Sequence, residues 1–135
     1  MASRTQPRDD ASIPDAIQQL DEMLAGARAE HAEGRLRAAG TLAVSGAVRA
    51  CDLLCDSELG YHSTAPNHRA AIDLLATVPN SHELVEDLEV CISRKRDLNY
   101  SVETFTEHDV VEVIEAAQRL GSAAKERLNK RDLSP

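Results

Sequence analysis

Apolar residues recur three or four positions apart along five stretches of this 135-residue chain. That spacing places them on one face of an α-helix, with the polar residues between them facing solvent. The five stretches are residues 12–30, 34–59, 68–79, 80–100 and 106–130. The alternation typical of a β-strand is convincing nowhere, and the nearest approach, "VETFTE" at residues 102–107, is short and isolated. The pattern therefore predicts an all-α, up-and-down bundle of about five helices.

Residue types at the ends of these stretches are those of helix termini. Three of the starts pair Ser, Asn or Thr with an acidic residue three positions later, which is the pattern of a capping box. The pairs are Ser12 with Asp15, Asn80 with Glu83, and Thr106 with Asp109. Gly60 is suited to end the second helix. A chain of this length corresponds to one domain, so we expect a helical domain at 12–130, a flexible tail at 1–11 and a frayed end at 131–135.

The second stretch, residues 34–59, is the longest, and we expect it at the centre of the bundle. Gly40 and Gly46 weaken a helix by roughly 1 kcal/mol each relative to Ala, which suggests that another backbone approaches closely there. Cys51 and Cys55 share a face and can in principle bind a metal with two further ligands. Small Cys side chains are also common in apolar cores. We expect a packing role for both Cys and no metal site.

The acidic composition narrows the classes of partner. The formal net charge is −8, and an evenly negative surface repels phosphate unless a local basic patch overrides it. No apolar run approaches the roughly 20 residues that span a bilayer. The polar start lacks the apolar segment of a secretion signal, and three Cys without such a signal suggest a reducing compartment. We therefore expect a cytoplasmic, microbial protein without membrane contact.

Motifs of several common enzyme classes are missing from the sequence. Two His one turn apart around a Glu, as in metalloproteases, do not occur, nor does a phosphate-binding Gly-rich loop or a nucleophile elbow. The sequence therefore suggests no cofactor. Two of the five His, His62 and His68, flank the loop "STAPN".

The stretch "RKRDLNY", residues 94–100, concentrates three cations near the predicted end of a helix in an acidic chain. One interpretation is a helix terminus, where each cation adds about 0.3–1 kcal/mol and Asp97 and Asn99 form a turn. The other is a binding site in which Arg96, Asp97 and Tyr100 face inward or across a dimer axis. An Arg guanidinium there can hold a phosphate with two hydrogen bonds. Composition alone favours the first interpretation.

The order of these segments resembles that of the small bacterial HEPN proteins (higher eukaryotes and prokaryotes nucleotide-binding domain). The resemblance covers most of residues 13–128. It rests on Gly60, Tyr61 and His68, then "AIDLL" at 71–75, "RKRDLNY" at 94–100 and "EAAQRL" at 115–120. HEPN domains are all-α bundles and commonly homodimers. Active members are metal-independent ribonucleases in which an Arg supports the RNA phosphate and a His takes part in proton transfer.

For this chain the resemblance implies a site at the end of the fourth helix. Its catalytic positions are Arg96, Asp97 and Tyr100, and its phosphate-binding positions are Arg94, Lys95, Arg96 and His68. Arg94 is an alternative to Arg96 as the Arg of the motif. The chain departs from the family where the His is expected, since Tyr100 stands nearest to that position. A Tyr with a pKa of about 10 transfers protons poorly at neutral pH, so His62 or His68 would have to supply this function.

The resemblance also implies a biological setting. Many HEPN proteins are toxins or phage-defence components, and some are silenced by a nucleotidyltransferase. We therefore expect an RNA- or nucleotide-binding protein of this type, a metal-independent endoribonuclease if it is catalytic. We expect it to be a homodimer, with an antitoxin-like partner. The alternative is a non-catalytic helical adaptor that works through a dimer or partner interface.

Overall fold

The described part of the chain folds into five α-helices, a short 3-10 helix and two short strands, which confirms the predicted all-α bundle. The computed structural model describes residues 4–100 and 105–132, without the side chains of residues 99 and 100. The elements in chain order are β1 (Thr5–Pro7), the 3-10 helix η1 (Asp10–Ser12), α1 (Ile13–Ala32), α2 (Leu36–Leu59), β2 (Tyr61–Ser63), α3 (His68–Ala76), α4 (His82–Tyr100) and α5 (Glu107–Lys130).

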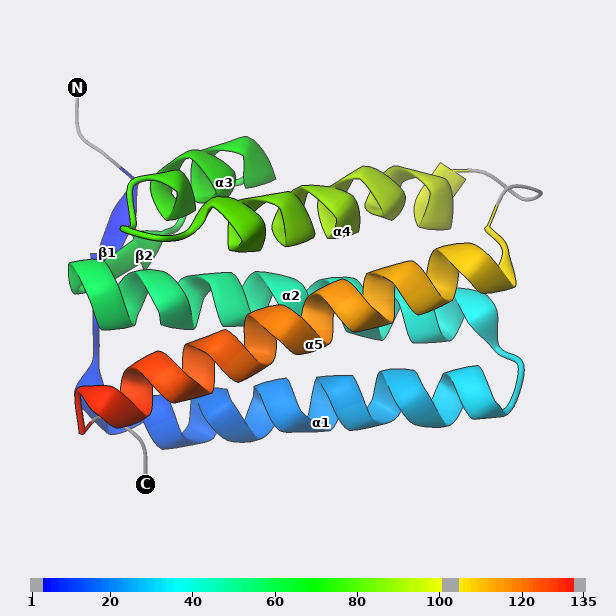
Figure 1. Cartoon of the computed structure of the whole chain (residues 1–135), viewed down its shortest axis with the longest axis horizontal. Helices are drawn as coiled ribbons and strands as arrows, with labels where there is room; N and C mark the ends of the chain where they lie inside the picture. The colour runs from blue at the N-terminus through cyan, green and yellow to red at the C-terminus, as the bar shows by residue number, and fades with distance from the viewer. Residues whose placement is uncertain (1–3, 101–104, 133–135) are drawn as a thin grey trace.

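The four long helices alternate in direction along the long axis of the molecule (Figure 1). The helix α2 packs against α1, α4 and α5, and α5 packs in turn against α1 and α4. The central pair is therefore α2 and α5, with α1 and α4 on either side of it. The short helix α3 lies beside the first half of α4, at the same end of the bundle as the two strands (Figure 1). The predicted central position of α2 is confirmed.

The core consists mostly of Leu, Val and Ala, and its small residues let side chains from other helices approach closely. A Cβ atom on Gly40 would lie 2.6 Å from the Cζ atom of Phe105 and 2.8 Å from a methyl carbon of Leu98. A Cβ atom on Gly46 would lie 3.1 Å from a methyl carbon of Leu24. The predicted close approach is therefore present, but side chains make it and not another backbone.

Two of the predicted helix ends are present as expected. Gly60 follows α2 with a left-handed φ of 84°, and its N–H donates to the carbonyl of Asp56. At the start of α5, the Thr106 side chain accepts from the backbone N–H of Asp109, and the Asp109 carboxylate accepts from the N–H of Thr106. This reciprocal pair satisfies two N–H groups that have no partner within the helix.

Two other helix starts differ from the prediction. Ser12 makes no side-chain capping bond, because one turn of 3-10 helix precedes α1 and Asp9 accepts from the N–H of Ala11 instead. Asn80 has a left-handed φ of 59° and belongs to the turn before α4, which begins at His82. In both places the local turn competes successfully with the capping box that the sequence suggests.

The bundle also carries a small sheet of two strands, which the sequence pattern does not indicate. The strands β1 and β2 pair antiparallel, with Gln6 opposite His62. Further backbone bonds run from Arg8 N to the Gly60 carbonyl and from Thr64 N to the Arg4 carbonyl, at 2.9 and 2.8 Å. The segment expected to be a flexible tail thus includes β1 and η1. Three-residue strands are too short to show alternation, so only their pairing defines them.

Among the described helices, α2 alone is long and apolar enough to cross a membrane by length and composition. The prediction that no stretch approaches this length and apolarity is therefore wrong for α2. However, 61% of the apolar window is buried inside the bundle, as expected for the core helix of a soluble protein. Burial by the neighbouring helices accounts for its apolar character without a membrane.

Candidate functional site

Arg94 is the most constrained cation of the "RKRDLNY" stretch. Its Nη2 atom lies 3.2 Å from Asp109 Oδ1 and 3.3 Å from Glu112 Oε1, both on α5. Its Nη1 atom lies 3.5 Å from Asp97 Oδ2 on its own helix. Burial opposes the charge of Arg94, but these carboxylates raise its pKa above the ordinary value. Arg94 therefore joins α4 to α5, and its guanidinium is already engaged by three carboxylates.

Replacing Arg94 with glutamine is expected to lower the free energy of unfolding by roughly 1–2 kcal/mol, because the nearly buried Asp109 carboxylate loses its cation. Urea denaturation measures this loss. The matched control is Arg96→Gln, since Arg96 is exposed and an exposed charge contributes little to stability. Equal stability of the two variants would contradict the structural role of Arg94.

Arg96 points into solvent, and among the described residues it forms no hydrogen bond or ion pair. The Tyr100 side chain lies outside the described residues, so the predicted group of Arg96, Asp97 and Tyr100 stays a prediction. The helix-terminus interpretation also needs correction, because α4 continues to Tyr100 and its last turn holds no cation. Its terminal carbonyls instead accept from Arg37 of α2, whose Nη1 atom lies 3.2 Å from Asp97 O and 2.9 Å from Leu98 O.

Lys95 and His68, both predicted to bind phosphate, are in direct contact. The Lys95 Nζ atom donates to the His68 Nε2 atom at 2.7 Å, which joins α4 to the first residue of α3. Burial and the Lys95 charge lower the pKa of His68 below its ordinary value. The imidazole is therefore neutral at pH 7. Within the part of the chain that the structure describes, Lys95 has no carboxylate in ion-pair range.

Lys95 and His68 line a hollow of about 280 Å³ over the middle of α2. We call it the α2 hollow. Its lining residues are Met23 of α1, Val44, Ser45, Val48, Arg49 and Asp52 of α2, His68 of α3 and Lys95 of α4. The Arg49 Nε atom is buried and has no hydrogen-bond partner among the residues that the structure describes. Buried N–H donors are nearly always paired, so this one is suited to an acceptor that a ligand would bring.

Asp52 is the one carboxylate among the residues that line the α2 hollow. Burial raises its pKa to about 6, although the charges of His62 and Arg49 act in the opposite direction. One turn further along α2, the Asp56 carboxylate accepts a hydrogen bond from His62 Nδ1 at 2.8 Å. Burial likewise raises the pKa of Asp56, and the bond from His62 opposes this effect. The hollow thus adjoins a second, more deeply buried pair of titratable groups.

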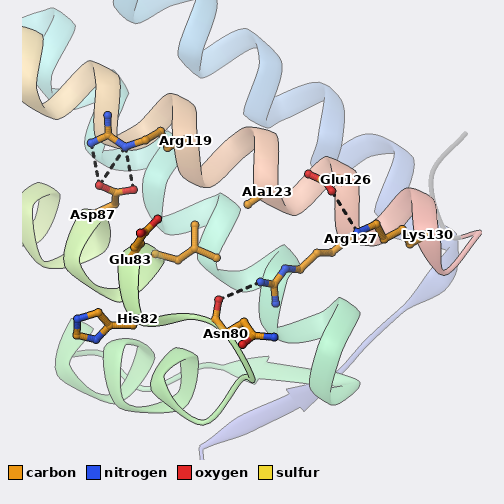
Figure 2. Close-up of a pocket in the computed structure, with 10 residues that line it drawn as sticks. Asn80, His82, Glu83, Asp87, Arg119, Ala123, Glu126, Arg127 and Lys130 are labelled. Atoms are coloured by element: carbon orange, nitrogen blue, oxygen red, sulfur yellow. Dashed lines mark hydrogen bonds and ion pairs between the residues drawn. The ribbon is translucent and has the colours of Figure 1, made fainter.

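A larger cleft of about 540 Å³ lies between the start of α4 and the end of α5 (Figure 2). Its cations are already engaged. Arg119 Nη2 lies 2.8 Å from Asp87 Oδ1, Arg127 donates to the backbone carbonyl of Asn80, and Lys130 pairs with Glu126. Its three cations face three carboxylates, those of Glu83, Asp87 and Glu126. The charges balance, so this cleft offers an anion less attraction than the α2 hollow.

The three Cys are buried, free thiols. A hydrogen bond with Cys55 and burial raise the pKa of Cys51 well above its ordinary value. Burial raises the pKa of Cys91 to about 12. Since the thiolate is the reactive and metal-binding form, the raised pKa values disfavour such chemistry at Cys51 and Cys91. The burial of Cys51 and Cys55 fits the packing role predicted for both.

Neither Arg49 nor Asp52 is among the site residues predicted from the sequence. A signal was present, because Ser45, Arg49, Asp52 and Asp56 recur at spacings of three and four along the most apolar helix. Such a polar stripe on a core helix marks a face that neighbouring helices leave uncovered.

No protein-family model, curated protein or solved structure matches the chain. The resemblance to HEPN proteins therefore stays a prediction. The geometry and charge of the α2 hollow carry the functional argument.

Proposed function

We propose that the chain is a HEPN-like protein that binds RNA or nucleotide phosphate in the α2 hollow. The observation that carries this proposal is the Lys95–His68 contact at 2.7 Å, in a hollow that also exposes Arg49. Two cations, Arg49 of α2 and Lys95 of α4, line it with the neutral His68 of α3 and a single carboxylate. This local excess of positive charge stands out in a chain with a net charge of −8.

The composition of the α2 hollow suits a phosphate with an organic group attached. Phosphate oxygens accept charge-assisted hydrogen bonds from the Lys95 ammonium and from the unpaired Nε–H of Arg49. Met23, Val44 and Val48 supply an apolar wall on the α1 and α2 side, against which a base or a sugar can pack. The volume of about 280 Å³ is close to the lower end of the usual range for small-molecule sites.

His68 supports a catalytic version of this proposal. A neutral imidazole is the form that accepts a proton from a 2′-hydroxyl group, which is the first requirement of metal-independent RNA cleavage. Its acceptor atom, His68 Nε2, is held by Lys95, so this role requires that a bound phosphate draw the Lys95 ammonium away from the imidazole. His68 would then take the role of the His that is missing beside Tyr100. Cleavage itself, a toxin–antitoxin or phage-defence setting and a nucleotidyltransferase-type partner rest on the resemblance alone.

The proposal does not require a second copy of the chain for phosphate binding, because one chain supplies the whole lining of the α2 hollow. A homodimer follows only from the resemblance. Sedimentation of the purified chain shows whether it is a monomer or a homodimer, and an RNA-binding assay on the same sample shows whether that form binds phosphate. A monomer that binds RNA would support RNA binding in the α2 hollow, and it would exclude a binding site composed of two copies of the chain.

RNA binding is expected to weaken by roughly sevenfold between about 50 and about 200 mM salt, since contact with about two phosphates of a single strand releases a matching number of counterions. Fluorescence anisotropy of a labelled single-stranded RNA measures this change. Binding that is indifferent to salt would contradict the proposed mechanism. No binding even at low salt would favour the adaptor alternative. The same RNA, incubated in EDTA and run on a gel, reports any metal-independent cleavage.

A further inference from the structure

The α2 hollow places a carboxylate where a phosphate would bind. Asp52 lines the same space as Arg49, His68 and Lys95. An ionised Asp52 is an internal counter-ion for Arg49 and Lys95, since His68 is neutral at pH 7, and the carboxylate repels an incoming phosphate. Two anions in one partly buried site of this size cannot both be fully charged without a large electrostatic cost. Either the phosphate binds weakly or Asp52 gives up its charge.

The groups around Asp52 come from every element that borders it. On α2 itself, Arg49 attracts its negative charge and Asp56 repels it. From β2, His62 attracts it, while His68 of α3 and Lys95 of α4 share its hollow. The α1 side contributes the uncharged Met23. Despite these cations, burial dominates and disfavours the ionised carboxylate.

We propose that phosphate binds in the α2 hollow together with a proton on the Asp52 carboxyl group, so that Asp52 makes RNA binding depend on pH. This inference rests on the proposed function and adds its regulation. In the protonated form the carboxyl O–H is a hydrogen-bond donor and can bond to a phosphate oxygen. In the ionised form the same group is only an acceptor, and it competes with the phosphate for Arg49 and Lys95.

The expected effect follows from proton linkage. Since the pKa of Asp52 lies at about 6, roughly three-quarters of the carboxyl groups are protonated at about pH 5.5 and roughly 3% at about pH 7.5. Strict coupling therefore weakens RNA binding by roughly 25-fold over this interval. An RNA without terminal phosphates keeps its backbone charge throughout, so the change cannot come from the ligand backbone.

The decisive variant is Asp52→Asn, which keeps the size of the side chain and removes its charge. Folding should not suffer. Because the folded-state pKa of Asp52 is raised to about 6, the free energy of unfolding falls as the pH rises from about 4 to about 6 and stays lower above that range. Asparagine lacks this cost. At about pH 7.5 the variant is expected to bind the RNA roughly 30-fold more tightly than the wild type. The matched control, Glu89→Gln, removes the same charge from an exposed position of α4 outside the hollow.

His68 also gains a proton below neutral pH, and its positive charge then also strengthens RNA binding as the pH falls. The contribution of His68 to the pH dependence must therefore be separated from that of Asp52. A His68→Gln variant is expected to retain most of the pH dependence, and the Asp52→Asn/His68→Gln double variant to lose it. Calorimetry in buffers of different ionisation enthalpy counts directly the protons that the protein takes up when it binds RNA. It is expected to give close to one proton taken up per bound RNA by the wild type at about pH 7.5, and far fewer by Asp52→Asn.

The outcomes are distinguishable. If the wild type binds RNA but Asp52→Asn shows the same affinity and pH profile, the Asp52 inference is overturned and the phosphate site stands. If the wild type binds no RNA even at about pH 5.5, where the site is most positive, the proposed function fails and this inference with it. Equal gains in RNA affinity for Asp52→Asn and Glu89→Gln would mean that the net charge of the protein, and not the place of Asp52 in the hollow, causes the effect. This outcome also overturns the inference.

Discussion

Replacing Lys95 with glutamine is expected to weaken RNA binding by about tenfold to a hundredfold. The Lys95 ammonium contacts His68 at 2.7 Å and lines the α2 hollow, where it can form a charge-assisted hydrogen bond to phosphate. Losing the charged partner of such a bond costs about 1.5–3 kcal/mol of binding free energy. The free energy of unfolding should change little, because Lys95 is exposed. Fluorescence anisotropy and urea denaturation measure the two quantities on the same sample.

The matched control for this variant is Lys130→Gln, which makes the same chemical change in an exposed residue of α5. Lys130 pairs with Glu126 one turn away and borders the larger, charge-balanced cleft. The Lys130→Gln variant should therefore lower RNA affinity by twofold at most, because it removes only a long-range attraction to the RNA that salt screens. The neighbouring Arg96→Gln variant should also have a small effect, since Arg96 does not line the hollow. Equal losses for Lys95→Gln and Lys130→Gln would mean that only overall charge matters.

Truncating Leu54 to alanine is expected to lower the free energy of unfolding by about 3 kcal/mol. Leu54 is fully buried on α2, the helix that packs against α1, α4 and α5. Removing its methyl groups loses their transfer free energy and leaves a cavity that the surrounding helices fill only in part. For a domain with a typical stability of about 5–15 kcal/mol, this is a large fraction. Urea denaturation measured by circular dichroism gives the value.

A suitable comparison is Leu42→Ala on the same helix, which keeps the change in helix propensity equal. Leu42 is only partly buried, so its truncation should cost roughly 1 kcal/mol. A similar loss for both variants would contradict the central place of α2 in the bundle.

Most of the fold could be predicted because it depends on periodicity within single segments. Five stretches with helical spacing became five helices with nearly the same bounds, and Gly60 and Thr106 mark helix ends as expected. The small sheet depends instead on pairing between Gln6 and His62, far apart in the sequence. Nothing local in either strand signals the other. The same holds for the start of α1, where a preceding 3-10 turn replaces the expected capping bond of Ser12.

The site was harder to predict, because neighbouring residues on a helix face different surroundings. Successive side chains are rotated by about 100° around the helix, so Arg94, Lys95 and Arg96 cannot share one environment. Arg94 reaches α5, Lys95 reaches α3, and Arg96 points to solvent. The sequence contained a hint, since Lys95 continues the apolar stripe that includes Leu88. Which part of α2 stays uncovered depends on how α1 and α4 pack, and a single sequence does not reveal this.

The most direct test of the central claim is an NMR titration of the ¹⁵N-labelled wild-type chain with a short single-stranded RNA. The account predicts that amide shifts change at residues 44–52, at His68 and at Lys95, all of which border the α2 hollow. It also predicts that residues 119–130, along the larger cleft, stay unchanged. Shifts confined to that cleft, or no shifts at low salt and mildly acidic pH, would contradict the assignment of the phosphate site.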